Sequence, residues 1–334
     1  MEKNSNTDHP ADAGQRCIAC GDLQRADARG FNSLFSGGQV VYLSCDTCGL
    51  MALKQDSFPS PAAPLYPDDY YGNGHTKHRL PVNVLRQVLS AWKTHRINAL
   101  IPKRPIKVLD IGCGDGTFLA QMRKPNVEIY GVELSGTAFN RASRVENIHL
   151  VAAEQLRANT YPEHYFDVIT LWHVLEHVPD PCQTLRSCRN WLAPDGYLFI
   201  EVPNIASWQA QLFKKNWFHL DAPRHLFLFT PRSLEKILQN TDFRIVGRKS
   251  FSFEMGVFGA VQSMLNAGIK PHNLLYDMLR SQKKCPGTVL SKLLSFTAAI
   301  ILFPAGLLVA LCESIAHQGA VIRFSCRQAN GPRR

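Results

Sequence analysis

The sequence predicts an α/β protein with one open, mostly parallel sheet that is covered by helices on both faces. From residue 106 onward, short apolar runs that suit buried strands alternate with helical patterns, at the interval typical of parallel strands joined by crossover helices. A glycine-rich turn follows the first of these runs, and two CxxC pairs precede the whole pattern. The 334 residues suffice for one such domain with smaller additions.

The expected elements follow one another in a regular order. Five strands are predicted by KVLDIG, VEIYGVEL, NIHLVAA, FDVITLW and GYLFIEV, and helices between them by GTFLAQMRK, GTAFNRASR and CQTLRSCRNWL. Thr230 and Pro231 are the expected cap and first position of a further helix, which leads to a sixth strand in FRIVGRKSF. AVIRFSCR predicts a seventh, closing strand.

Composition divides the chain into six expected segments. They are a disordered polar tail at 1–14, a cysteine module at 15–52, a linker and N-terminal helix at 53–104, the main domain at 105–252, an apolar helical insertion at 253–317, and a closing strand and tail at 318–334. The ten cysteines suggest no disulfide framework and the N-terminus lacks a secretory core, so we expect a reducing, cytoplasmic compartment. The net charge of +10 favours an anionic partner without choosing among nucleic acid, phospholipid and phosphorylated metabolite.

The glycine-rich turn has the features of a nucleotide-type pocket. VLDIGCGDGTF places Gly112, Gly114 and Gly116 between a strand and a helix, where a ligand can approach backbone amides. A dinucleotide fingerprint would read GxGxxG, whereas this loop reads GCGDG after Asp110. The pattern resembles the first motif of class I S-adenosylmethionine-dependent methyltransferases of the methyltransferase-23 type. The resemblance continues over roughly residues 105–250, through AAEQL, FDVITLWHVLEHVPDP and LAPDGYLFIEVPN, and it implies a Rossmann-like seven-stranded sheet.

The same resemblance implies that S-adenosylmethionine is the cofactor. In that family the acidic residue before the glycines, here Asp110, organises the loop around the methionine part of the cofactor. Glu133 lies about 20 positions further on, at the end of the second strand, where a carboxylate can accept both ribose hydroxyls. We assign its neighbour Leu134 to the same pocket, and the resemblance places Glu154 beside the adenine.

Histidines supply the candidate catalytic groups. Methyl transfer requires an aligned acceptor and removal of a proton, so a base with a near-neutral pKa is expected. His173 and His177 occur in HVLEHV, and His225 occurs in WFHLDAPRHLFLFT; both segments follow predicted strand ends. The second segment, read with the following TPRSLEKIL, resembles sugar methyltransferases that have an N-terminal zinc module. This resemblance favours His225 as general base, the alternative being a histidine that holds a loop in place.

A rival interpretation of the first histidine segment is a metal site. His173, Glu176 and His177, taken with a later histidine, resemble the metal site of small-RNA 3′-end 2′-O-methyltransferases, and imidazole with carboxylate can bind a divalent ion. That family begins its motif with Glu where this chain has His173.

The N-terminal cysteines predict a structural zinc site. Cys17, Cys20, Cys45 and Cys48 form two CxxCG turns, each of which directs two thiolates towards one ion. Four thiolates leave no open position for catalysis, and a module this small needs such a staple to fold. In the similar sugar methyltransferases the module helps to cover the acceptor site, and Tyr70 and Tyr71 are further candidates for covering the cofactor.

Residues 293–312 form an apolar stretch of twenty residues without a charge. Their number suits a membrane span, but a closing strand that must rejoin the sheet excludes a single crossing. We therefore expect the stretch to turn back at FPAG, either as a buried hairpin or as a patch dipping into one leaflet. Basic residues precede it and favour an anionic surface: Lys270, Arg280, Lys283, Lys284 and Lys292.

Together these observations favour an enzyme that methylates a small or lipid-linked acceptor, most plausibly a sugar or glycan precursor at oxygen or carbon. One alternative is a zinc-ribbon RNA methyltransferase, since positive charge and a cysteine module suit RNA. Against it, the fourth strand ends in LWHVLEH rather than in an NPPY-like motif, and no aromatic platform for bases is evident. A second alternative is a non-catalytic binding protein with the same fold.

Overall fold

The computed structural model describes residues 15–26, 31–32, 39–55, 80–100, 104–280 and 285–330. The expected tail at 1–14, most of the linker, Tyr70 and Tyr71 lie outside the described residues. The boundaries of the six expected segments therefore stay predictions.

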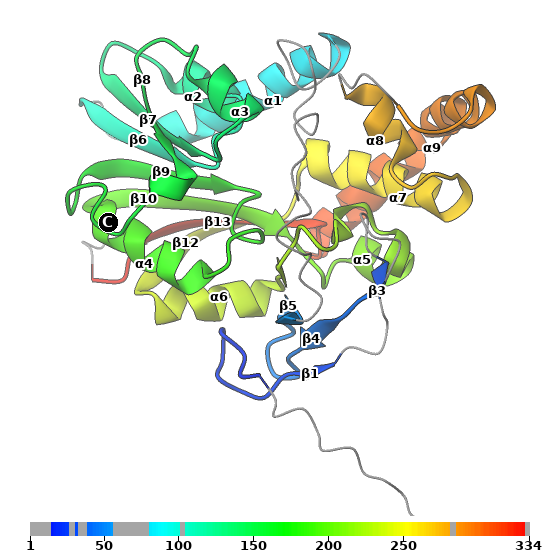
Figure 1. Ribbon diagram of the computed structural model, residues 1–334, viewed down its shortest axis with the longest axis horizontal. Coiled ribbons are helices and arrows are strands. Elements are labelled where there is room, and N and C mark those ends of the chain that lie inside the picture. Colours follow the sequence, from blue (N-terminus) through cyan, green and yellow to red (C-terminus); the bar gives the residue numbers. More distant parts are fainter. Residues whose placement is uncertain are drawn as a thin grey trace, which may run out of the picture.

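The central element is a seven-stranded sheet in the order β12-β13-β10-β9-β6-β7-β8 (Figure 1). Neighbouring strands from β8 to β10 are parallel, and β13 is antiparallel to both β10 and β12. The predicted fold class is confirmed, including the closing strand, and the strands in the middle of the sheet, such as β6, β9 and β13, are buried along most of their length. The strands are β6 Ile106–Ile111, β7 Val127–Glu133, β8 Ile148–Ala152, β9 Phe166–Trp172, β10 Leu192–Pro203, β12 Phe243–Lys249 and β13 Val321–Gln328.

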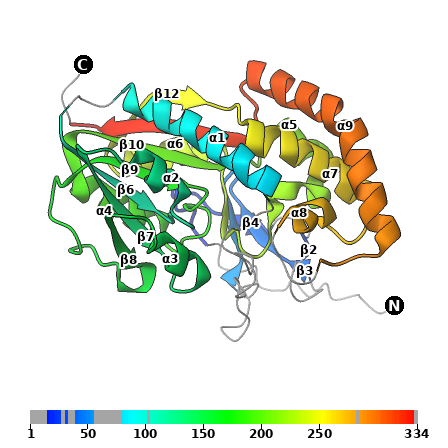
Figure 2. The same ribbon diagram turned by 90° about the horizontal axis from the view of Figure 1, so that it is seen from above.

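Helices cover both faces of this sheet, α1 to α3 on one side and α4 and α6 on the other (Figures 1 and 2). Thr230 caps α6 as expected, because its side chain accepts from the Ser233 amide while Ser233 reaches back to the Thr230 amide. The helices are α1 Leu80–Asn98, α2 Thr117–Met122, α3 Thr137–Ala142, α4 Pro181–Trp191 and α6 Pro231–Asn240.

The N-terminal module is joined to the main domain by a shared sheet. Its short strands are β1 Arg25–Ala26, β4 Tyr42–Ser44 and β5 Met51–Leu53, and a separate pair is formed by β2 Phe31–Asn32 and β3 Gln39–Val40. The fourth strand of the module's sheet is β11, Phe227–Leu228, which the main domain supplies and which pairs with β5. Thr230 Oγ1 donates to the Cys48 carbonyl oxygen at 2.7 Å, and Asn240 donates to that of Ala19 at 3.0 Å. The module is thus packed against α6 and the segment before it.

The insertion between β12 and β13 is helical. It comprises η6 Phe253–Val257, α7 Phe258–Gly268, α8 Leu274–Leu279 and α9 Val289–Ile315, and it lies at the end of the molecule away from β8 (Figures 1 and 2). The expected turn at FPAG is wrong, because α9 continues through Pro304 as one helix of 27 residues. The expectation of a buried hairpin is also wrong, since only 17% of the most apolar window of α9 is buried.

Three short helical pieces connect β10 to β11. They are α5 Trp208–Phe213, η4 Lys214–Asn216 and η5 Phe218–Leu220, and the second histidine segment follows directly. The carboxyl ends of β6, β7, β9 and β10 therefore lie at the same sheet edge as these pieces, and this edge is where ligands of open α/β sheets bind.

Candidate active site at the carboxyl edge of the sheet

The glycine loop lies between β6 and α2 and has a left-handed backbone at each predicted glycine. Gly112, Gly114 and Gly116 have φ values of 71°, 60° and 77°. A Cβ on Gly112 would stand 2.3 Å from Val174 Cγ2, whereas a Cβ on Gly114 would meet no atom within 4 Å. Open space beside a left-handed glycine backbone allows a ligand to approach closely, so the loop fits the cofactor that its sequence predicts.

The two predicted acids flank this loop in different ways. Glu133, at the end of β7, accepts the Gly114 amide through Oε2 at 2.7 Å and the Leu134 amide through Oε1 at 3.0 Å. Asp110 is 2% exposed and accepts a 2.5 Å hydrogen bond from the Thr170 hydroxyl. Burial raises the pKa of Asp110 to about 7, although the bond from Thr170 opposes the shift. Asp110 is therefore held at the end of β6 by β9, whereas Glu133 contacts the glycine loop directly.

The remaining predicted cofactor residues lie beyond the next strands. Glu154, in η3 Ala153–Gln155, accepts hydrogen bonds from the Ser135 amide at 3.0 Å and from the Ser135 hydroxyl at 3.1 Å. Leu134 is 41% exposed at the start of the same turn. Hydrogen bonds from backbone amides lower the pKa of Glu154, so its carboxylate is charged and holds this turn closed beside β7.

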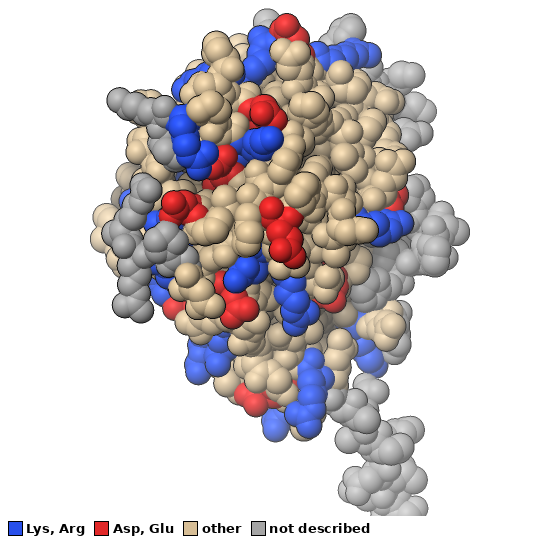
Figure 3. Space-filling view, turned by 90° about the vertical axis from the view of Figure 1, so that its left-hand side faces the viewer, with Lys and Arg blue, Asp and Glu red and all other residues tan. Residues whose placement is uncertain are grey.

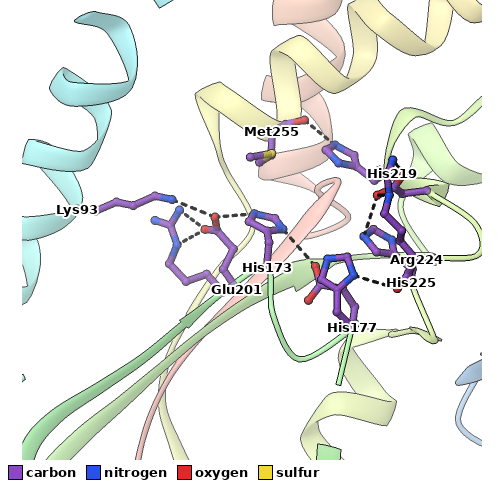
Figure 4. A network of polar contacts seen from close by, with 11 residues as sticks. Lys93, His173, His177, Glu201, His219, Arg224, His225 and Met255 are labelled. Carbon is purple, nitrogen blue, oxygen red and sulfur yellow. Dashed lines mark hydrogen bonds and ion pairs between the residues drawn. The ribbon is translucent and has the colours of Figure 1, made fainter. Parts of the chain in front are cut away.

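A buried charge network lies at the ends of β9 and β10 and was not predicted (Figure 4). Glu201, in the middle of the apolar run FIEV, is fully buried and is paired with Arg323 of β13 and with Lys93 of α1, whose Nζ lies 3.2 Å from Oε1. A charged residue inside the apolar run of each of two strands, Glu201 in FIEV and Arg323 in VIRF, was the available signal, because a buried charge needs a partner of opposite sign. Trp172, at the end of β9, lies beside this network, with Lys93 Nζ 5.0 Å from its ring centre.

His173 belongs to this network rather than to the other histidines. Its Nε2 lies 3.1 Å from Glu201 Oε1 and its Nδ1 lies 3.5 Å from Glu176 Oε1. Burial works against the charged form, but the hydrogen bonds to Glu176 and Glu201 outweigh it and raise the pKa of His173 to about 9. The imidazole is therefore a cation at neutral pH and has no free site for accepting a proton. Its backbone has a φ of 56°, an uncommon conformation that directs the chain from β9 into the next turn.

His177 and His225 lie together, on the side of His173 away from Glu201 (Figure 4). Their ring centres are 4.6 Å apart, and His177 Nδ1 lies 2.9 Å from the Arg224 carbonyl oxygen. His225 is 6% exposed, and its Nδ1 has no hydrogen-bond partner among the described residues. Burial, followed by the nearby His177, lowers the pKa of His225 to about 3, so its imidazole is neutral.

The rival metal interpretation can now be compared with the geometry. Glu176, His177 and His225 each offer one ligand atom, and these atoms all lie within 4.8 Å of one another. His173, the first member of the expected ligand set, points to Glu201 instead. The structure thus brings together three of the four residues that this interpretation requires, with His225 as the later histidine.

The segment that carries His225 is held from two directions. Arg224 Nε donates to Asp221 Oδ2 at 2.9 Å, and the amides of Leu226 and Phe227 donate to the Glu176 carbonyl oxygen at 2.8 and 3.2 Å. From the N-terminal module, the buried Tyr42 hydroxyl donates a 2.6 Å hydrogen bond to the His225 carbonyl oxygen. The two histidine segments and the cysteine module therefore form one connected unit, which sequence spacing did not indicate.

The four predicted cysteine ligands converge as expected. Their Sγ atoms all lie within 4.8 Å of one another, with Cys17 and Cys48 separated by 3.5 Å and Cys20 and Cys45 by 3.3 Å. Four converging thiols that belong to no disulfide are a donor set suited to a tetrahedral zinc ion. The cluster joins the same apolar core as α6, so an ion bound there would stabilise the face of the module that contacts the main domain.

Comparisons with known proteins decide the family of this region. A family model described as a methyltransferase domain matches residues 84–247, which contain the glycine loop, Glu133 and both histidine segments. Residues 84–247 are a methyltransferase domain. Among curated proteins, the chain is 33% identical over 133 residues to the ubiquinone biosynthesis O-methyltransferase of Glaesserella parasuis serovar 5, covering 37% of this chain and 55% of that protein. It is also 33% identical over 133 residues to the protein of the same name from Haemophilus ducreyi, with the same coverage.

The chain thus spans about half the length of the curated relatives it matches, 55% in both cases. A solved structure of an S-adenosylmethionine-dependent methyltransferase from Archaeoglobus fulgidus is similar to 72% of this chain and 94% of that chain, with a TM-score of 0.44 and 18% identity. The methyltransferase domain matched by the family model excludes the cysteine module, the helical insertion and β13. Of these, β13 completes the seven-stranded sheet, whereas the cysteine module and the helical insertion lie outside that sheet.

Proposed function

We propose that the protein transfers a methyl group from S-adenosylmethionine to a small-molecule acceptor. The observation that carries this proposal is the open left-handed loop at Gly114, with the carboxylate of Glu133 at its mouth, inside a class I methyltransferase domain. Gly112, Gly114, Gly116, Asp110 and Glu133 would hold the cofactor, with Leu134 and Glu154 at the adenine side. When bound, S-adenosylmethionine supplies a methyl group on a sulfonium that leaves as a neutral thioether.

The chain's own histidines divide into a cation and a neutral base. The charged His173 can fix or polarise an acceptor, whereas the neutral His225 can accept a proton. A low pKa makes His225 a weak base, but a hydroxyl becomes strongly acidic once its oxygen bonds to a methyl group, so a weak base suffices at that point. We therefore keep His225 as the proposed general base and assign His173 and His177 to positioning.

The acceptor class is a finer proposal. The names of the curated relatives support an oxygen target on a small molecule, and the cysteine module supports the sugar or glycan precursor suggested by the similar sugar methyltransferases. We further propose that the four cysteines hold structural zinc, and that the protein acts in the cytoplasm with residues 293–312 in contact with a membrane surface, where a lipid-linked acceptor would be available.

Cofactor binding tests the central proposal. Isothermal titration of the full chain with S-adenosylhomocysteine should give one site per chain. Gly114→Val should weaken the binding of S-adenosylhomocysteine at least tenfold. The valine side chain would fill the open space, and the φ of 60° strains any residue with a Cβ. The control is Gly268→Val, since a Cβ on Gly268 would also meet no atom within 4 Å, but this glycine lies at the end of α7. A folded wild-type protein that binds no S-adenosylhomocysteine would refute the proposal.

The acceptor can then be sought directly. Purified protein with methyl-labelled S-adenosylmethionine and a cell extract should label polar metabolites or lipids. Label in RNA would overturn the acceptor class while leaving methyl transfer intact.

A further inference from the structure

The long helix α9 exposes most of its large apolar side chains, and its buried positions are small or polar residues. The fully buried positions are Ser295, Gly306, Ala310 and Glu313. The exposed side includes Ile300 at 62%, Ile301 at 76% and Ile315 at 81% exposure, in a series with Leu290, Leu293, Leu294, Phe296, Phe303, Leu308 and Leu311. This pattern is the reverse of that expected for a helix on the surface of a water-soluble domain.

The buried face of α9 is fitted to the rest of the insertion and cannot exchange with the exposed face. A Cβ on Gly306 would stand 2.6 Å from Val261 Cγ2 of α7, so that a larger side chain there would force the helices apart. Near the other end, the Glu313 carboxylate accepts from the Gln209 amide at 2.7 Å and from the Gln209 side chain at 2.6 Å. Rotating α9 would break these contacts, so its orientation is determined by the fold.

The exposed apolar surface is too broad for a second helix to cover. At 100° per residue, the large apolar side chains from Leu290 to Ile315 occupy an arc of about 180° around α9. A packed helix pair buries a narrower seam of the a and d type, which would leave much of this arc in water. Lipid acyl chains have no preferred direction and cover such an arc completely, which favours a bilayer over a second copy of the chain.

Both ends of α9 are attached to the same side of the molecule. The helix packs against α7 and α8 and is followed within six residues by β13, which lies in the main sheet between β10 and β12. Since α9 is about 40 Å long at 1.5 Å per residue, its length would permit a crossing, but its C-terminal end would then be separated from the sheet by the membrane. The compatible arrangement is a helix lying in the plane of one leaflet.

Basic side chains are gathered near the N-terminal end of α9. Pro271 approaches Gly287, which directly precedes the helix, and its neighbours Lys270 and His272 lie in the same loop. Lys270 Nζ is in contact with His272 Nε2, and the pKa of His272 is lowered by burial and then by the positive charges of Lys270 and Lys215. A cluster of this sign suits anionic phospholipid headgroups at the edge of a buried apolar helix.

The opposite side of the molecule has a different character. Figure 3 views the face away from the insertion and shows Lys, Arg, Asp and Glu side chains dispersed among one another. A mixed surface of this kind suits water, so the two ends of the molecule differ in the medium to which they are fitted.

From these observations we propose that α9 lies in the plane of one leaflet of an anionic bilayer, with its apolar arc among the acyl chains and the basic cluster at the headgroups. This inference refines the membrane contact proposed above and does not depend on methyl transfer. The helical insertion would then be the membrane-binding part of the protein, and the glycine loop lies on the sheet beside it.

Vesicle flotation tests whether α9 binds an anionic bilayer. The full chain should float with phosphatidylcholine vesicles that contain phosphatidylglycerol, and less with phosphatidylcholine alone. The double variant Ile300→Asp, Ile301→Asp should lower the bound-to-free ratio at least tenfold, whereas Val246→Asp, on the exposed edge strand β12, should leave it unchanged. Lys215→Glu with Lys270→Glu should remove the preference for the anionic vesicles.

Two further outcomes separate this proposal from its alternatives. The proposed membrane contact is refuted if the wild-type chain does not float with the vesicles. It is also refuted if the double isoleucine variant floats as well as the wild type. If the wild-type chain does not float but sediments as a dimer without lipid, and the isoleucine variant sediments as a monomer, the apolar surface of α9 binds a second copy of the chain instead. Titration of the wild-type preparation with S-adenosylhomocysteine tells the two proposals apart, because a wild-type chain that binds S-adenosylhomocysteine but does not float refutes the membrane contact of α9 alone.

Discussion

The charge on His173 should give the protein a measurable pH dependence of stability. Its pKa is raised from 6.5 to about 9 by the carboxylates of Glu176 and Glu201, against the effect of burial. A group whose pKa is raised on folding stabilises the native state fully below its unfolded pKa, and this contribution is lost as the pH rises through the folded pKa. One unit of difference between the folded and unfolded pKa corresponds to about 1.4 kcal/mol of stability. The free energy of unfolding should therefore fall by about 3 kcal/mol as the pH rises from 6.5 to 9.

The substitution His173→Asn isolates this contribution, because asparagine tolerates the left-handed backbone at φ 56°. We expect the wild-type free energy of unfolding, measured by urea denaturation at several pH values, to fall between pH 6.5 and 9, and the variant to lose most of this slope. His164→Asn is the matched control, since His164 has a φ of 59° and pairs with the Leu192 carbonyl oxygen rather than with a carboxylate. An unchanged slope in His173→Asn would refute the assignment of a charged imidazole.

The remaining predictions concern the cofactor, the base and the module. Glu133→Gln should weaken S-adenosylhomocysteine binding at least tenfold in calorimetry, because the charged acceptor at the mouth of the loop is lost; equal affinity would remove Glu133 from the site. His225→Gln should leave this binding intact and slow methyl transfer at least a hundredfold, and full activity would exclude the base role. Elemental analysis should find one zinc per chain, and chelation should lower the melting temperature; an unchanged Tm after complete metal removal would contradict a structural ion. Tyr42→Phe should destabilise the protein by about 1–2 kcal/mol in denaturation, since it removes a buried hydrogen bond to the His225 carbonyl oxygen, and a smaller effect would mean that water replaces the hydroxyl.

The sheet and its loop were predictable because their signals are local. Strands buried on both faces read as continuous apolar runs, so the seven strands from KVLDIG to AVIRFSCR could be placed before their neighbours were known. Gly114 was recognisable because a turn at φ 60° with space for a ligand tolerates few other residues. The cysteine pairs were equally legible, since each CxxC turn brings two sulfur atoms together whatever the rest of the chain does.

The histidines could be named from the sequence, but their roles could not. His173 and His177 are four residues apart, yet one becomes a cation beside Glu201 and the other lies against His225, because these partners come from β10 and from the turn before β11. The salt bridge between Glu201 and Arg323 joins residues 122 positions apart, and no local pattern reports such a pairing.

The sequence by itself determined the succession of strands along the chain, the glycine loop, the two CxxC pairs and the absence of charge from 293 to 312. Only the tertiary structure decided how these parts meet. β11 joins the module to the main domain, Tyr42 donates a hydrogen bond to the His225 carbonyl oxygen, and α9 continues through Pro304 with most of its large apolar side chains exposed. Periodicity records which residues share a face of a helix, but which face is covered depends on the helices that pack against it, and for α9 the small residues facing α7 made that choice.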